Sequence, residues 1–193
     1  MIFKYYGVEY KAINGKKEDS DYKKIPVVVT NGVQINDSFI IVKSFARILC
    51  GLDLTPELLE VEQMTTSGLM IALEVAVAGS CTELNKCASK MDCCFCMILS
   101  SCSCLICCMA PGYIRDKHPA LQNLEFYKSS YTVALGDKKY FHGENPGIVD
   151  ISICGVLAPF IHADNEFVRE FLGANGKLKE WYDRIRPVLP NIF

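Results

Sequence analysis

Strand signals are confined to the first 36 residues of this 193-residue chain, and the segments after residue 52 have the pattern of helices. Residues 8–13 alternate apolar and polar side chains, and residues 25–30 form a β-branched run, so both predict strands. Asn31-Gly32 predicts a two-residue hairpin turn, after which residues 33–35 return as the partner strand. Strands followed by helices predict an α/β unit packed on a separate all-helical unit.

The predicted helices begin directly after the hairpin. Asn36-Asp37-Ser38 offers good N-cap residues for a helix that ends at Cys50-Gly51. Residues 52–56 are the predicted linker, which gives a first domain over 1–51 and an all-helical domain over 56–193. Thr55-Pro56 begins the next helix, with proline at its first position. Apolar content and periodicity predict further helices over residues 64–81, 93–109, 118–135, 147–161, 166–172 and 178–186.

Composition excludes some functions and favours others. The chain has 20 basic and 22 acidic residues, so it has no basic excess of the kind that nucleic-acid binding favours, and we expect no nucleic-acid partner. The first ten residues lack the apolar run of a secretion signal, and we therefore expect a cytoplasmic protein with reduced thiols.

Seven of the 11 cysteines lie between Cys93 and Cys108, where Cys93/Cys96 and Cys104/Cys107 form two Cys-x-x-Cys pairs. Such pairs can hold zinc or an iron–sulfur cluster, but their separation is shorter than in a zinc ribbon. The favoured interpretation is a buried helix that uses cysteine as a small apolar residue, with no metal bound. This uncharged stretch is long enough in principle to cross a bilayer; its serines and Pro111 favour a bundle helix or a shallow membrane contact.

Three short patterns resemble the glutathione transferase superfamily: Ile25-Pro26 at the start of a β-branched strand, Asp37-Ser38 at the start of a helix, and Gly147 to Asp150 before an apolar helix. The resemblance implies a partial thioredoxin-like (glutaredoxin-like) N-terminal domain, followed by the family's all-helical C-terminal domain. It also implies that glutathione is the cofactor.

The same resemblance implies a binding site. The backbone at Ile25 and Pro26 would pair with the cysteinyl part of glutathione. The helix N-terminus and the Ser38 hydroxyl would hold the γ-glutamyl carboxylate, and Asp37 its amino group. A purely structural alternative remains, in which Asp37 and Ser38 form an ordinary helix cap without a ligand.

The third pattern resembles the capping box of the central helix in this superfamily. Asp150 is placed to accept from the backbone of a cap at Gly147, and Pro146 and Ile151 have the spacing of a hydrophobic staple. Glycine departs from the pattern at the cap, where serine, threonine or asparagine is usual.

Within the superfamily, residues 8–50 and 115–186 are most similar to the membrane-associated type-two prostaglandin E synthases. The resemblance implies a glutathione-dependent isomerase or transferase that acts on a hydrophobic electrophilic or peroxide substrate. It also implies a homodimer and peripheral membrane contact. In that family a Cys-Pro-x-Cys turn precedes the segment that Met1 to Tyr10 matches, and residues 1–6 resemble the end of the helix after that turn. We therefore assign no catalytic residue. A non-catalytic binding or scaffold protein of the same fold, and a cysteine-cluster metal protein, are the alternatives.

Overall fold

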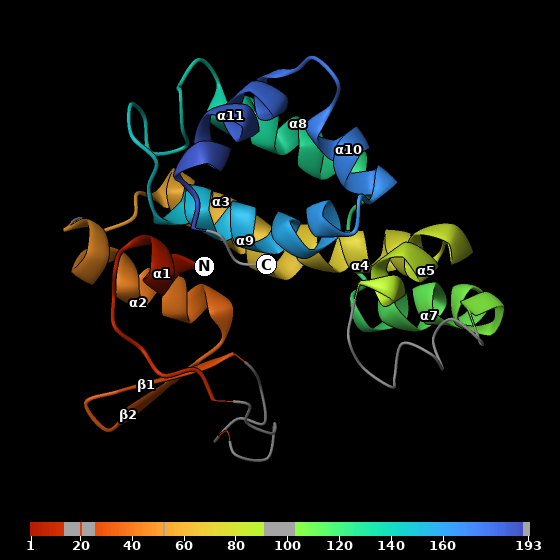
Figure 1. Ribbon diagram of the computed structural model, residues 1–193, viewed down its shortest axis with the longest axis horizontal. Helices are drawn as coiled ribbons and strands as arrows, with labels where there is room; N and C mark the ends of the chain where they lie inside the picture. Colours follow the sequence, from red (N-terminus) through yellow and green to blue (C-terminus); the bar gives the residue numbers. More distant parts are fainter. Residues whose placement is uncertain (14–19, 21–25, 52, 91–102, 191–193) are drawn as a thin grey trace.

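The computed structural model describes residues 1–13, 20, 26–51, 53–90 and 103–190; it is mostly helical and contains a small two-stranded antiparallel sheet (Figure 1). Strand β1 (Val27–Thr30) pairs with β2 (Val33–Asn36). Asn31 and Gly32 have φ angles of 49° and 75°, and positive φ at both central residues is what a type I′ turn requires. The predicted hairpin is confirmed.

Two helices connect the hairpin to the rest of the protein. Helix α1 (Ile2–Tyr5) precedes it, and α2 (Ser38–Cys50) follows with Asp37 as its N-cap and Gly51, at φ 72°, as its left-handed C-cap. One face of α2 is buried and packs on α9 (Ile148–His162). The hairpin thus lies over a helix that belongs to the main core.

The predicted strand over residues 8–13 is wrong. This segment has no regular structure, and Tyr10 and Ile13 are 53% and 76% exposed. The backbone N–H of Val8 donates instead to the Phe3 carbonyl at 2.8 Å, which closes a turn after α1. A strand needs a neighbour for its backbone groups, and within the described residues the sheet consists of β1 and β2 alone.

The helical part begins with one long run. Helix α3 (Pro56–Met64), the π-helix η2 (Thr65–Leu69) and α4 (Met70–Ala78) follow one another without a break, and α5 (Cys81–Ser89) then turns away by 107°. The remaining elements are α7 (Ser103–Lys117), α8 (Leu124–Leu135), α9, α10 (Glu166–Leu172), α11 (Lys177–Ile185) and the short 3-10 helix η3 (Arg186–Val188).

Two predicted helices differ from those observed. The helix predicted over 64–81 is divided by η2 and ends at Ala78. A new N-cap, Ser80, then begins α5 at Cys81. The helix predicted from residue 118 begins at Leu124, because the side chain of Asn123 accepts from the Phe126 N–H at 2.9 Å and caps it there. Residues 93–102 of the predicted cysteine-rich helix lie outside the described residues.

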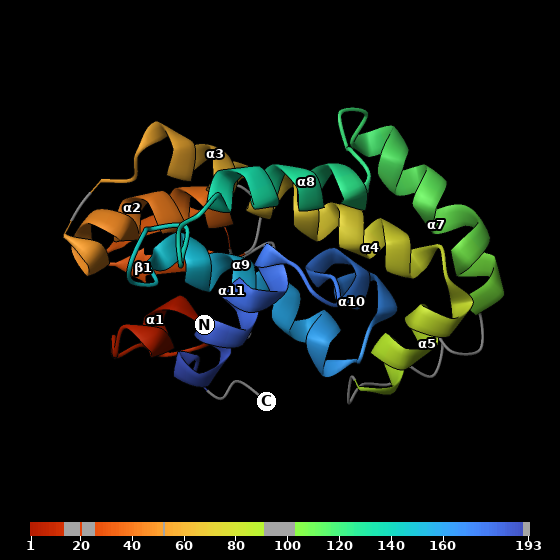
Figure 2. The same ribbon diagram turned by 90° about the horizontal axis from the view of Figure 1, so that it is seen from above.

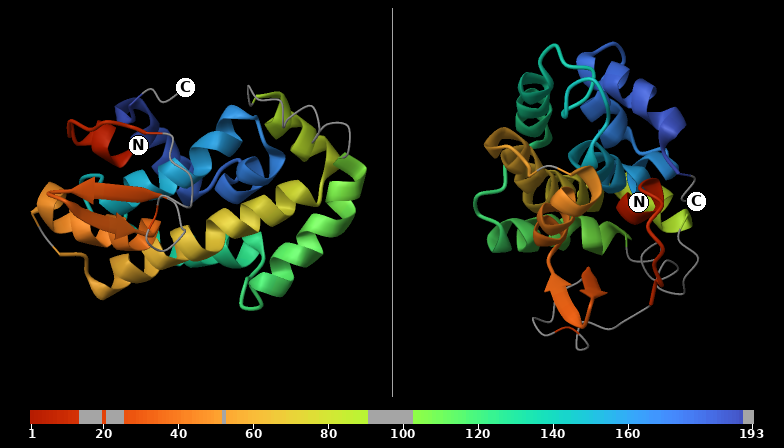
Figure 3. Two further views of the ribbon diagram at one scale, coloured as in Figure 1. Left: turned by 90° about the horizontal axis from the view of Figure 1, so that it is seen from below. Right: turned by 90° about the vertical axis from the view of Figure 1, so that its left-hand side faces the viewer.

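Helix α9 is the centre of the molecule. It contacts α1, α2, α3, η2 and α10, and the residues of its first half are almost fully buried. Figures 2 and 3 show the elongated arrangement around it, with α1, α2 and the hairpin at one end and α5 and α7 at the other. Side chains from α2 and from the later helices share one hydrophobic core.

Candidate functional site

Three of the four predicted ligand-binding residues, Pro26, Asp37 and Ser38, lie at or near the N-terminus of α2. Asp37 has a φ of +77°, a region that residues other than glycine rarely adopt, and its Oδ1 accepts from the Phe39 N–H at 2.9 Å. Backbone strain of this kind costs about 1–3 kcal/mol and is concentrated at binding and active sites. Ser38, the first residue of the helix, is half-buried.

The hairpin register brings Pro26 to the same end of the sheet. Val27 is opposite Asn36, so Pro26 directly precedes the first residue of β1 where Asp37 directly follows the last residue of β2. Pro26 is exposed. The fourth predicted residue, Ile25, lies outside the described residues.

Polar side chains fasten this end of β2. The Asn36 side chain donates to Gln34 Oε1 at 3.1 Å and accepts from the buried Ser20 hydroxyl at 2.6 Å. Sequence reasoning did not single out Ser20 or Asn36 as partners, because the two residues are 16 positions apart and nothing local relates them. Their hydrogen bond fixes the backbone that enters Asp37.

The described cysteines with altered pKa values are not activated nucleophiles. Burial raises the pKa of the Cys154 thiol far above its usual range, and it also raises that of Cys87. Cys50 lies at the opposite end of α2 from Asp37, about 18 Å away along the helix axis, and its sulfur is 3.1 Å from the Tyr6 hydroxyl.

A second group of polar side chains is buried between α3, η2, α8 and α9. Glu62 is fully buried; its Oε1 accepts from the Ser152 hydroxyl at 2.8 Å, and its Oε2 has no hydrogen-bond partner. Burial raises the pKa of the Glu62 carboxyl to about 8. Three residues further along, the Thr65 and Tyr131 hydroxyls are 2.6 Å apart. Because its pKa lies above 7, the Glu62 carboxyl is protonated at neutral pH.

Sequence reasoning missed this network. The one available signal is position: Glu62 lies four residues after Leu58 and seven before Leu69, which are both core residues, so an acidic side chain falls on an apolar stripe. The π-helix next to it has no sequence signature. It is tightly packed, since a Cβ placed at Gly68 would be 2.5 Å from the Tyr127 ring.

The third buried feature is the start of α9. Gly147 is its N-cap, and the Asp150 carboxylate accepts from the Gly147 N–H at 3.0 Å and from the Phe141 N–H at 2.9 Å. It also accepts from the Trp181 indole N–H at 2.8 Å. Asp150 is fully buried, and this one carboxylate joins the 141–147 loop, α9 and α11.

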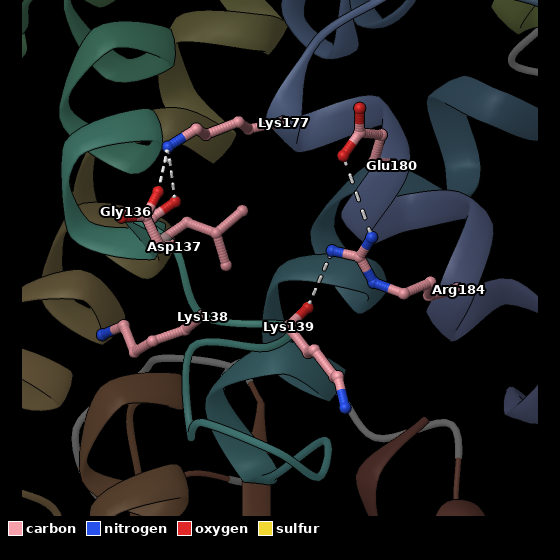
Figure 4. A pocket seen from close by; sticks show the side chains of 8 residues that line it. Gly136, Asp137, Lys138, Lys139, Lys177, Glu180 and Arg184 are labelled. Atoms are coloured by element: carbon pink, nitrogen blue, oxygen red, sulfur yellow. Dashed lines mark hydrogen bonds and ion pairs between the residues drawn. The ribbon is translucent and has the colours of Figure 1, made fainter.

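A pocket of about 230 Å³ opens between the end of α8 and α11, away from α2 (Figure 4). It is lined by Leu135, Gly136, Asp137, Lys138, Lys139, Lys177, Glu180 and Arg184.

Two of the four cations that line this pocket are paired with its two carboxylates, and a third, Lys139, is paired with Glu144 at 2.6 Å. Lys177 Nζ is 2.8 Å from Asp137, and the Arg184 guanidinium is 3.9 Å from Glu180 and donates to the Lys139 carbonyl at 3.1 Å. The side chains of Lys138 and Lys139 extend away from each other and out of the cavity (Figure 4). The geometry therefore does not favour an anion-binding site here.

Two further predictions concern metal and membrane. Among the described residues no group of three or more histidine, cysteine or acidic side chains could hold a metal ion; the predicted cluster from Cys93 falls mostly outside those residues. Within the same described part, no single helix has both the length and the apolarity to cross a bilayer, although the bent pair of Pro56–Ala78 and Cys81–Ser89 meets both criteria together.

No protein-family model, curated protein or solved structure matches the chain.

Proposed function

We propose that this chain is a glutathione-transferase-type protein that binds glutathione at the N-terminus of α2. The observation that carries the proposal is the strained backbone of Asp37, held next to Ser38 and to the Pro26 end of β1. Strain that the fold maintains at a polar helix start is consistent with a ligand-binding position.

The arrangement suits the two charges of a γ-glutamyl group. The first-turn N–H groups of a helix have no intrahelical acceptor, and the positive end of the helix dipole attracts a carboxylate. The ligand carboxylate would accept from the Ser38 hydroxyl and from the first-turn N–H groups other than that of Phe39. Asp37 uses one oxygen for the Phe39 N–H, which leaves the other for the ligand's ammonium group.

The finer assignment follows the resemblance. We propose a partial thioredoxin-like domain in residues 1–51, a glutathione-transferase-type helical domain from residue 56, and a relation to the type-two prostaglandin E synthases. A cytoplasmic homodimer with peripheral membrane contact belongs to the same proposal. Since burial raises the pKa values of Cys87 and Cys154, these thiols do not favour chemistry on a hydrophobic electrophile or peroxide. Binding without turnover is the function that the described residues support best.

Calorimetric titration of the full chain with glutathione tests this proposal. Asp37→Asn keeps a capping side chain but loses the charge, and we expect affinity about 10- to 100-fold weaker, since a charge-assisted hydrogen bond contributes about 1.5–3 kcal/mol. N-acetylated glutathione has no ammonium group and should bind the wild type and the variant equally. Thr55→Ala, at the N-cap of α3, is the matched control and should bind as the wild type does.

Equal binding of glutathione by the wild type and by Asp37→Asn would refute the proposed site. Failure of the wild type to bind at all would favour the structural role of Asp37 and Ser38. Turnover of glutathione that persists with serine at all eleven cysteine positions would contradict the account of the thiols.

A non-catalytic scaffold is the second candidate, and the sheet is the observation that favours it. Two strands alone are marginally stable, and an uncovered edge tends to pair with another chain. Val29 in β1 is 65% exposed. If this edge associates, light scattering should give a mass that rises with concentration, and Val29→Lys should lower it; a monomer at every concentration would exclude this role for the hairpin.

A further inference from the structure

The N-cap of α9 has an unusual neighbour. Gly147 has no side chain with which to accept a hydrogen bond from the first turn of the helix. The imidazole ring of His142 fills the space where a Cβ at Gly147 would lie, because a Cβ built there would overlap three ring atoms. The ring's Nε2 accepts from the Val149 N–H at 3.4 Å.

Val149 is the second residue of α9. Its N–H is one of the two from which the side chain of an N-cap serine or threonine would accept a hydrogen bond. His142 therefore provides the acceptor that Gly147 lacks. Glycine is required at the cap for the same reason, since any side chain would displace the ring.

The loop that contains His142 is fixed in place. Tyr140 and Gly143 exchange two backbone hydrogen bonds, of 2.9 and 2.8 Å, which close a tight turn around the histidine. The backbone N–H of His142 also donates to Asp150 Oδ2 at 3.4 Å. The ring thus reaches the helix start from a turn that the same helix anchors.

We propose that His142 is the working N-terminal cap of α9, in place of the absent cap side chain, and that protonation of its ring releases this cap and makes the start of the helix acid-sensitive. The cap requires the neutral tautomer, with its proton on Nδ1 and the lone pair of Nε2 free. The imidazolium form would present an N–H to the Val149 N–H and a positive charge to the positive end of the helix dipole.

The groups around the ring decide which form is present. Burial is the largest influence and lowers the pKa of His142 below its usual value of 6.5. Asp150, from α9, acts in the opposite direction and raises it, while Lys138, from the loop, lowers it further. From α11, Trp181 donates to Asp150, and Arg184 contacts the Lys139 carbonyl of the same loop. The net direction favours the neutral, capping form at pH 7.

The sign of the pH effect follows. The folded protein binds the proton less readily than the unfolded chain, so the contribution of His142 is fully present above pH 6.5 and is lost as the pH falls from 6.5 through the folded pKa.

The test is the thermal midpoint Tm of the full chain between about pH 5 and 8. His142→Gln retains an acceptor that does not titrate, so we expect the wild-type Tm to drop relative to that of this variant as the pH falls below 6.5. His142→Ala removes the cap, and should lower Tm at pH 7.5 by about 2–4 °C, as loss of one cap does in a chain of this length.

The matched pair of variants is Gly147→Ser with and without His142→Ala. Serine alone should lower Tm through its overlap with the ring. In the double variant the ring is gone and the serine can cap Val149 itself, so Tm should recover to above that of either single variant. Additive losses in the double variant would overturn the proposal.

Amide NMR adds a readout that a merely structural role would not give. The Val149 N–H resonance should titrate with the same midpoint as the His142 ring, below pH 6.5, and should not titrate in His142→Gln. A Val149 resonance that is independent of pH in the wild type, or a ring midpoint at or above 6.5, would refute the inference.

Discussion

Replacement of Glu62 by glutamine should remove a large part of the pH dependence of stability. Glu62 is fully buried, one of its carboxyl oxygens accepts from Ser152, and the other has no partner. Burial raises its pKa from the usual 4.5 to about 8. At pH 7 the folded protein must therefore hold a proton that the unfolded chain has released.

The size of the effect follows from these two pKa values. Each pH unit between them changes the free energy of unfolding by about 1.36 kcal/mol. The penalty is absent below pH 4.5, reaches about 3 kcal/mol at pH 7 and levels off at about 5 kcal/mol above pH 8. Stability from this group is therefore lost as the pH rises, which is the sign expected for an acid whose pKa is raised by folding.

Glutamine keeps the acceptor for Ser152 but adds an amide NH₂ that also needs a partner, at a cost of about 1–3 kcal/mol. The slope with pH, and not the stability at one pH, is therefore the decisive quantity. Urea unfolding followed by circular dichroism, at intervals between about pH 5 and 8, should show that Glu62→Gln gains about 4 kcal/mol relative to the wild type across this range. Glu60→Gln, on the exposed side of α3, is the matched control and should run parallel to the wild type. Parallel profiles for Glu62→Gln and wild type would refute the reasoning, because the carboxyl would then be ionised in the fold.

Two further perturbations test the packing. Gly68→Ala should destabilise the protein by about 1–3 kcal/mol, since its Cβ would be 2.5 Å from the Tyr127 ring. Gly112→Ala in α7, where the space is open, should be neutral or stabilising by up to about 1 kcal/mol. Urea unfolding distinguishes the two variants, and equal effects would contradict the close approach at Gly68. Asp150→Asn should lower the free energy of unfolding by about 2–4 kcal/mol, because one amide oxygen replaces two carboxylate oxygens that accept from several N–H donors. A tryptophan fluorescence spectrum like that of the wild type, together with unchanged stability, would show that Trp181 does not depend on this carboxylate.

Local signals in the sequence predicted the parts of the fold that local chemistry determines. Asn31-Gly32 predicts its hairpin because both residues tolerate positive φ, and Thr55-Pro56 predicts a helix start because threonine caps well and proline suits the first helical position. The strand predicted over residues 8–13 failed for the opposite reason. Alternation shows that a segment could pair, and whether a neighbouring strand exists is a property of the whole fold.

The site was predictable to a similar degree. Asp37 could be placed at a helix start from its neighbours, but its positive φ and its position beside Pro26 depend on the hairpin register. The one signal for Glu62 was its place on an apolar stripe, and the role of His142 could not be predicted from the sequence. Their partners, Ser152 and Val149, are 90 and seven residues away, and neither contact has a characteristic spacing.

The buried Glu62 and the half-buried His142 act on the same helix with opposite signs. Ser152 and the capped Val149 both belong to α9, so ionisation of Glu62 and protonation of His142 each weaken its packing. Between the folded pKa of His142 and pH 6.5, the histidine makes stability rise with pH and the glutamate makes it fall. The two slopes oppose each other there, and a shallow wild-type profile in that range would not mean that neither group titrates. The single variants separate them: relative to the double variant, stability should rise with pH in Glu62→Gln and fall with pH in His142→Gln. A double variant that keeps either contribution would show that a group other than Glu62 and His142 causes it.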